Sequence, residues 1–375
     1  MKIIHVLSGL TKGGGERVVV ELANQSAANG DEVTILAGWP EDPVYLQNMV
    51  HPDVEVRFIS SGKSYRYFKT IPWIFVNRKW ICSNDILHCH LTFGVYFGSV
   101  VNGLLKKILR NKKPVIVETN HSVGMAVPKF NRWVHSRMAL QCAGVAFMAT
   151  DPYWADFMLK HPRLKTEIIP NGISVLKVNN DSAQTQQLLN GAGIPEDYKY
   201  LVGSISMLRP DRKPWLYVPL FEEIYKTLGN KVHFVLGGSG EEIDKIIKLI
   251  KEKDLSENFH LIGLVNEPTH IISLIDVYVS ISVGETSGIS MIEAAMSNVP
   301  VVGIQLVDGY KAKESDWVWS DTDISEVAKK IIELLSNTEQ RNKLKETQRE
   351  YVTKHFTSDA MYSSFNLFYK RVLSS

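Results

Sequence analysis

Short apolar runs alternate with segments of helical periodicity along this chain. The first run covers residues 3–7 and leads into glycines at positions 13–15. From Glu16 the apolar residues fall on one helical face, Gly30 stands where a left-handed cap ends such a helix, and residues 33–37 form a second run. The pattern predicts a strand, a glycine loop, a helix and a second strand.

The same alternation continues to the carboxyl terminus. A helix is predicted over residues 99–109, and from Glu339 onwards the chain is predicted to be helical, with Met361, Phe365, Phe368 and Val372 on one face. Because parallel strands need crossovers, which are usually helices, the alternation indicates doubly wound α/β sheets. Further strands are predicted over residues 86–90, 114–119, 145–150, 201–205, 232–236, 260–262, 277–282 and 299–304.

The polar stretch over residues 179–187 separates two such series. A length of 375 residues also favours two domains, at about 150 residues each. We expect an amino-terminal Rossmann-like domain over residues 1–170 and a second one over residues 171–355. A helix over residues 356–375 is expected to pack back on the first domain.

Composition narrows the class of protein. A chain with 45% hydrophobic and 22% charged residues is globular, not collagen-like, coiled-coil or disordered. Cys82, Cys89 and Cys142 cannot all pair and lack metal-finger spacing, which favours a reducing compartment. No apolar run approaches the roughly 20 residues that span a bilayer, and the first run turns polar at Ser8, too early for a secretory signal. We therefore expect a soluble, cytoplasmic protein.

The net charge of +2 hides an asymmetry. Residues 1–170 hold 20 Lys and Arg against 13 Asp and Glu, whereas the remainder holds 22 against 27. Residues 56–117 contain 11 basic residues, one acid (Asp85) and interleaved aromatic residues. Such a segment suits an anionic membrane surface; a solvated basic face and nucleic acid are the alternatives. We expect membrane contact and no nucleic acid.

Ligands of open α/β sheets bind beyond the carboxyl ends of the strands. The loop with Gly14 and Gly15 lets a ligand approach the backbone at a helix start, although a plain tight turn explains it equally well. His121, two residues beyond a predicted strand, can donate to a bound oxygen, with a structural role as the alternative. His88 and His90 share one strand face, but two ligands without a carboxylate do not make a zinc site, so structural contacts are expected.

Two loops of the second series carry charge. Arg209, Arg212 and Lys213 follow a predicted strand and form a plausible diphosphate clamp, unless Asp211 pairs with them in a solvated loop. Glu285 and Glu293 flank Gly288, where a helical pattern begins after the strand over residues 277–282. Carboxylates accept paired hydrogen bonds from vicinal hydroxyls, which is how proteins hold sugars and ribose.

Taken in their order along the chain, these segments resemble those of the GT-B glycosyltransferases, specifically the large retaining family 4, which uses nucleotide-activated sugars. The resemblance covers nearly the whole chain, and its most specific part is the pair Glu285 and Glu293 with seven residues between them. The other matching segments are the glycine loop 13–17, the histidine-bearing strand 85–90, the strand 114–121 with its His, Pro-Asn-Gly at 170–172, and the loops 236–240 and 261–263.

The resemblance implies a role for each matching residue. Glu293 would hold the ribose, and Lys213 the diphosphate. His121 would contact the donor sugar near the reacting carbon, and the glycine loop would approach phosphate and acceptor. The family usually has an Arg five or six residues before the Lys, where this chain has Leu208 and Met207, so Arg209 or Arg212 is the candidate substitute. The sugar would also meet Glu285, Ser287, Gly288 and Ile289, and the base Leu261 and Gly263.

The implied protein has two lobes that face each other across a cleft, with residues 1–170 on the acceptor side and residues 171–355 binding the nucleotide sugar. It would move a hexosyl or N-acetylhexosaminyl group, with retention, from a UDP- or GDP-linked sugar to a lipid-linked or polysaccharide acceptor, lipopolysaccharide included, as a peripheral enzyme on the inner membrane face. No Asp-x-Asp pair directly follows a predicted strand, so we expect no metal and no other cofactor. A GT-B epimerase or phosphorylase, and a non-catalytic nucleotide-sugar-binding protein, are the alternatives.

Overall fold

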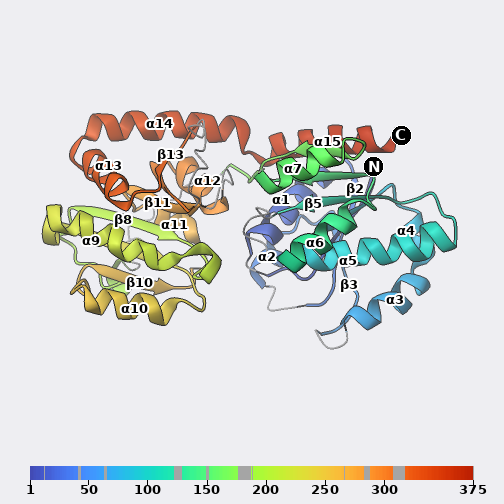
Figure 1. Ribbon diagram of the computed structural model, residues 1–375, viewed down its shortest axis with the longest axis horizontal. Helices are drawn as coiled ribbons and strands as arrows, with labels where there is room; N and C mark the ends of the chain where they lie inside the picture. The colour runs from blue at the N-terminus through green and yellow to red at the C-terminus, as the bar shows by residue number, and fades with distance from the viewer. Residues whose placement is uncertain are drawn as a thin grey trace. The chain divides into compact units, whose positions relative to one another are not determined.

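The structure is a computed structural model of the chain, and it describes residues 1–11, 13–40, 44–62, 66–121, 129–148, 152–175, 187, 189–265, 267–282, 288–306 and 317–374. These residues divide into two compact units. Unit 1 comprises Met1–Ser174 and His355–Ser375, and unit 2 comprises Val175–Lys354. Each unit is built around a parallel sheet (Figure 1).

The sheet of unit 1 has the strand order β3-β2-β1-β4-β5-β6-β7, and every described pairing in it is parallel. The chain order reverses direction at β1, which is the switch point of a doubly wound sheet and the place where such folds bind ligands. The strands are β1 (Lys2–Leu7), β2 (Glu32–Ala37), β3 (Val54–Phe58), β4 (Ile86–His90), β5 (Val115–Asn120), β6 (Gly144–Phe147) and β7 (Lys165–Ile168).

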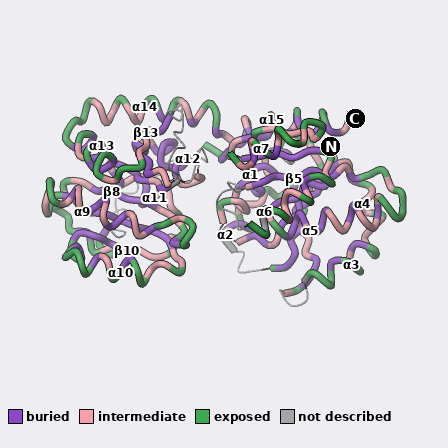
Figure 2. The backbone as a smooth tube through the Cα atoms, in the orientation of Figure 1, coloured by how far each residue is buried: buried purple, intermediate pink, exposed green. Residues whose placement is uncertain are grey.

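Apolar side chains cover both faces of this sheet. Ile4 and Val6 of β1 pack with Phe97 in one cluster, whereas Ile35 of β2 packs with Val19 of the first helix in another. Burial on both faces explains why the central strands read as continuous apolar runs (Figure 2). The helices are α1 (Gly14–Ala28), α2 (Val44–Asn48), α3 (Arg66–Val76), α4 (Arg78–Cys82), α5 (Leu91–Val101), α6 (Lys129–Ala139) and α7 (Pro152–Lys160).

The predicted helix over residues 99–109 begins earlier than its periodicity indicates. It is α5, continued by a π-helical stretch over Asn102–Ile108. Gly94 and Gly98 interrupt the apolar pattern, yet both are required by packing. A Cβ at Gly94 would lie 2.2 Å from the Val6 carbonyl oxygen, and one at Gly98 would lie 2.4 Å from Cys89 Sγ. Close approach of helix and sheet therefore selects glycine inside this helix.

The carboxyl-terminal helix α15 (Ser358–Leu373) packs on unit 1, where it lies beside α1 in Figure 1. Its buried face includes the residues Met361, Phe365, Phe368 and Val372. A Cβ at Gly144 of β6 would lie 2.8 Å from both Phe368 and Val372, so that this strand and the helix are in direct contact.

Unit 2 holds a second parallel sheet with the order β10-β9-β8-β11-β12-β13. Its strands are β8 (Tyr200–Ile205), β9 (Val232–Gly237), β10 (Phe259–Gly263), β11 (Val277–Ser282), β12 (Val301–Gln305) and β13 (Trp319–Asp321). Its helices are α9 (Tyr217–Leu228), α10 (Ile243–Glu252), α11 (Pro268–Ile272), α12 (Ile289–Met296), α13 (Ile324–Ser336) and α14 (Thr338–His355). No helix among the described residues is both long enough and apolar enough to cross a membrane.

Candidate functional site

Three loops of unit 2 meet at the carboxyl ends of β8, β9 and β10. The backbone N–H of Leu208 donates to the carbonyl of Ser239 at 3.0 Å, and that of Gly238 donates to Gly263 at 2.7 Å. A Cβ at Gly238 would lie 1.8 Å from the Ser206 carbonyl oxygen, and its φ of +136° also favours glycine. The structure thus brings the residues after β8 together with the nucleotide loop predicted around Leu261 and Gly263.

The three cationic side chains after β8 differ in how closely they pair with Asp211. Arg209 donates twice to the Asp211 carboxylate, from Nε at 3.1 Å and from Nη2 at 2.9 Å. Arg212 Nε lies 3.8 Å from the same carboxylate, and burial lowers the pKa of its guanidinium. The exposed ammonium of Lys213 has no hydrogen bond or ion pair with any described residue, although its backbone N–H and carbonyl are bonded within the turns. Asp211 therefore engages Arg209 most fully, and Lys213 is available to an anionic ligand.

Lys213 is held in an unusual backbone conformation. Its φ of 45° and ψ of 48° lie in the left-handed region, between two short 3₁₀ turns, Pro210–Arg212 and Pro214–Leu216. A non-glycine residue in this region is strained and is retained where the surroundings demand it. The proline at the start of each turn fixes φ and so helps to position the Lys213 backbone.

Glu293 lies in α12, which begins immediately after Gly288. The side chain of Glu293 is buried. The pKa of Tyr278 is raised, mainly by burial of its hydroxyl and to a smaller extent by the Glu293 carboxylate, while hydrogen bonds to the hydroxyl act in the opposite direction. The Tyr278 hydroxyl accepts from Ile205 N at 3.0 Å and donates to Ile205 O at 2.9 Å. The Glu293 carboxylate is therefore near the Tyr278 hydroxyl, which lies at the carboxyl end of β8, and Gly288 and Ile289 are half-buried at the start of the helix.

The remaining residues predicted for the donor sugar, Glu285 and Ser287, lie outside the described residues.

His121 of unit 1 follows β5 and lies against the glycine loop. A Cβ at Gly15 would be 3.7 Å from both Cγ and Nδ1 of His121 and 3.1 Å from Leu91. Gly14 begins α1, so the loop and the imidazole share one edge of the sheet. Burial lowers the pKa of His121 to about 4, so its ring is neutral at pH 7. The structure brings together these three predicted residues of the amino-terminal half.

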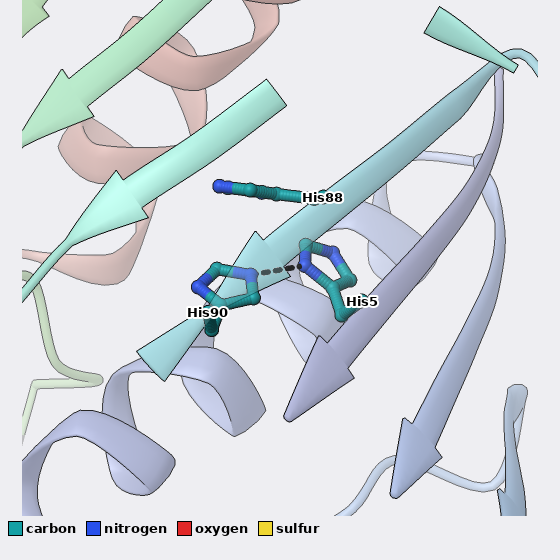
Figure 3. Close-up of side chains that lie close together, drawn as sticks. All are labelled: His5, His88 and His90. Carbon is teal, nitrogen blue, oxygen red and sulfur yellow. Dashed lines mark hydrogen bonds between the residues drawn. The ribbon is translucent and has the colours of Figure 1, made fainter. Parts of the chain in front are cut away.

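A cluster of buried histidines adjoins His121 and includes His5, which no sequence motif marks. His5 of β1 is in register with His88 of β4, which places His5, His88 and His90 on the same side of the sheet (Figure 3). Their ligand atoms lie within 4.8 Å of one another, a spacing that could hold a metal ion. The signal for His5 was a polar residue inside the first apolar run, and only the register reveals its partners.

Each histidine already has hydrogen bonds. His88 bonds Tyr369 Oη through Nδ1 at 2.7 Å and Thr119 Oγ1 through Nε2 at 2.6 Å. His5 Nδ1 lies 3.0 Å from His90 Nε2. The cluster found in the described residues contains no carboxylate or thiolate to offset the charge of a divalent ion. The hydrogen bonds agree with the expected structural contacts, and the expected absence of a metal remains a prediction.

Comparisons with known proteins agree with this architecture. Residues 12–175 match the family model Glycosyltransferase Family 4, and residues 187–351 match the model Glycosyl transferases group 1. The chain is similar in structure to Anabaena HepE, solved in complex with UDP and glucose, with a TM-score of 0.78, 15% identity, and coverage of 99% of this chain and 100% of that one. This likeness confirms the predicted fold class of two Rossmann-like domains.

Two curated relatives are similar in sequence. The N-acetyl-alpha-D-glucosaminyl L-malate synthase of Bacillus anthracis is 23% identical over 376 residues, which cover 96% of this chain and 94% of that protein. The poly(ribitol-phosphate) alpha-N-acetylglucosaminyltransferase of Staphylococcus aureus is 29% identical over 173 residues, which cover 45% of this chain but only 35% of that protein. With two family models that together span most of its length, the chain belongs to the GT-B glycosyltransferases.

Proposed function

We propose that this glycosyltransferase transfers an N-acetylglucosaminyl group from a UDP-linked donor, with retention, to an anionic small-molecule or cell-surface glycan acceptor. The observation that carries the proposal is that two relatives, one matched along nearly its whole length, are named for N-acetylglucosaminyl transfer. Uridine is favoured over guanosine because the similar Anabaena structure holds UDP. A hexose donor and a GDP-linked donor are the rival outcomes of the test below.

Unit 2 supplies the donor-binding groups in this proposal. Glu293 would hold the ribose hydroxyls, and Lys213 would neutralise the charge that develops on the departing diphosphate. We assign the second cation to Arg212 rather than Arg209, because Arg209 already donates twice to Asp211. Glu285 and the amides near Ser287, Gly288 and Ile289 would hold the sugar, while Leu261 and Gly263 would border the base.

The residues favour a particular route for the chemistry. The diphosphate leaves as the anomeric carbon becomes oxocarbenium-like, and the acceptor hydroxyl attacks on the face that the diphosphate vacates. The leaving phosphate oxygen takes the acceptor proton, so no protein base is required at that step. Cations perform the charge neutralisation that a metal performs in other enzymes, and we propose a metal-independent reaction.

Product analysis tests this function. The full chain is incubated with UDP-N-acetylglucosamine, UDP-glucose or GDP-mannose, together with L-malate or ribitol-phosphate oligomers, with and without EDTA. We expect α-linked product from UDP-N-acetylglucosamine, unchanged by EDTA, and none from Glu285→Ala, which should still bind UDP. Transfer from another donor alone, a β-linked product, or activity restored only by added Mg²⁺ or Mn²⁺ would each overturn the corresponding part of the proposal.

We propose further that unit 1 docks on anionic membrane through α3 and its basic neighbours. Helix α3 exposes 78% of Phe68, 50% of Ile71 and 51% of Phe75, beside Lys69 and the Arg78 guanidinium, which lies 4.7 Å from the Phe75 ring centroid. Apolar side chains next to cations are the combination that binds anionic lipid surfaces.

Vesicle sedimentation tests the docking. Charge reversal of Lys63, Lys69, Lys106 and Lys107 should release the protein from vesicles that contain phosphatidylglycerol, whereas vesicles of phosphatidylcholine alone should not bind it. Reversal of four exposed lysines of unit 2 is the matched control and should have little effect; these are Lys248, Lys251, Lys329 and Lys343. Equal sedimentation of both variants would discard the membrane surface.

A further inference from the structure

Three histidines form a continuous hydrogen-bonded chain from the interior of unit 1 to the glycine loop. His5 Nδ1 lies 3.0 Å from His90 Nε2, and His90 Nδ1 lies 3.0 Å from His121 Nε2. The first of these contacts is the dashed line in Figure 3. His5 and His90 are fully buried, while His121 is partly exposed. The chain therefore joins a sealed end to an end that a ligand can reach.

The tautomers of the three rings are coupled, because a neutral imidazole carries one N–H and each contact needs one donor and one acceptor. Burial lowers the pKa of His5 to about 3, that of His121 to about 4, and that of His90 well below its usual value, so all three rings are neutral at pH 7. Only two arrangements satisfy both contacts, and they differ in the direction in which every ring donates.

The sealed end decides between them. His5 Nε2 is buried and has no hydrogen-bond partner among the described residues. A buried N–H without an acceptor is rarer in proteins than an unpaired acceptor. His5 Nε2 is then the lone pair, so His5 donates from Nδ1 to His90, and His90 donates from Nδ1 to His121.

We propose that His5 and His90 are positioning residues that hold His121 as an Nδ1–H hydrogen-bond donor beside Gly15. Because Nε2 of His121 accepts from His90, its single proton is on Nδ1, the atom that a Cβ at Gly15 would approach to 3.7 Å. His121 then offers a donor to an oxygen of the substrate and does not act as a base. This use of the proton rests on the proposed function, whereas the tautomer itself does not.

The ring of His88 packs against this chain of three histidines but is not hydrogen-bonded to any of them. His88 lies with its ring centroid 3.9 Å from that of His90, and its two nitrogens bond Tyr369 and Thr119. Because Tyr369 belongs to α15, the carboxyl-terminal helix fixes one wall of the histidine chain. Only His5, His90 and His121 are linked to one another by these hydrogen bonds.

Nitrogen NMR of the ¹⁵N-histidine-labelled full chain at pH 7 tests the proposal, with His5→Leu, His90→Leu and His121→Gln used to assign the signals. We expect His5, His90 and His121 all in the Nδ1–H tautomer, the minor form of free histidine, and His121 shifted toward the Nε2–H form in His90→Leu. The spectrum of the unaltered chain decides the question even if a variant fails to fold.

Other results would overturn the proposal. These are an Nε2–H tautomer or a charged ring at His121, or tight binding of one equivalent of Zn²⁺ that shifts the signals of His5 and His90. The function is judged separately. If the tautomers are as expected but His121→Gln transfers sugar at the normal rate, the histidine chain stands and the role of His121 in the reaction falls.

Discussion

The carboxylate of Glu21 in α1 accepts hydrogen bonds from the backbone N and from Oγ of Ser174, 153 residues later in the chain, at 3.1 and 2.6 Å. Its other oxygen pairs with Arg17 at 2.8 Å. Glu21 is only 3% exposed, and Ser174 is the last residue of unit 1 before the chain enters unit 2. One buried carboxylate thus anchors the point at which the chain leaves the first sheet.

Removal of this carboxylate should loosen unit 1. Glu21→Ala removes the carboxylate that pairs with the largely buried Arg17 guanidinium and accepts from Ser174, and we expect a loss of about 3 kcal/mol in the free energy of unfolding. Hydrogen exchange read by mass spectrometry reports each unit separately and should show faster exchange in unit 1 alone. The exposed pair of Glu55 and Arg57 provides the control, since Glu55→Gln should change stability by less than about 0.5 kcal/mol. Equal effects of the two variants would contradict the anchoring role.

Two glycines of one helical segment should respond oppositely to alanine. Gly94→Ala would place a Cβ 2.2 Å from the Val6 carbonyl oxygen, a backbone atom that cannot move aside, and should cost at least about 1–3 kcal/mol. Gly103→Ala meets nothing within 4 Å and should be neutral or stabilise the helix by up to about 1 kcal/mol. Thermal unfolding of both variants checks this, and a tolerated Gly94→Ala would refute the close approach of α5 to β1.

These glycines also show what the sequence could and could not predict. The sequence predicts the buried strands because a strand covered on both faces is apolar at every position, whichever strands lie beside it. The edge strands β3, β7 and β13 were missed, since strands such as Lys165–Ile168 are half-exposed and mix polar with apolar residues. The glutamate and glycine motifs marked the site, but the partners of Arg209 and of His5 depend on loop geometry and strand register, which no local pattern encodes.

Acid should destabilise unit 1 through its buried imidazoles. The pKa of His5 falls to about 3 on burial, against about 6.5 in an unfolded chain, so below pH 6.5 the unfolded chain binds a proton that the native chain does not. The free energy of unfolding is therefore independent of this ring above about pH 6.5. It decreases as the pH falls toward 3, by up to about 1.4 kcal/mol per pH unit for each such ring. In urea titrations between pH 6 and 4, His5→Leu should reduce the pH dependence of the free energy of unfolding by the equivalent of one bound proton, about 1.4 kcal/mol per pH unit. Stability that increases toward pH 4 would contradict the assignment.

One substitution at Lys213 can distinguish the role of its side-chain charge from that of its backbone conformation. Lys213 has a φ of 45°, which glycine adopts without strain, so Lys213→Gly should leave the fold unchanged or up to about 1 kcal/mol more stable. The same variant removes the charge that we assign to the diphosphate, and kcat/KM for sugar transfer should fall about 100- to 1,000-fold. Arg209→Ala is the matched control, and because two donors of Arg209 already pair with Asp211, we expect it to lower kcat/KM less than about tenfold. Steady-state kinetics and thermal unfolding of both variants give the answer. If Lys213→Gly is active while Arg209→Ala is not, then Arg209 leaves Asp211 to bind the donor, and the two residues exchange roles.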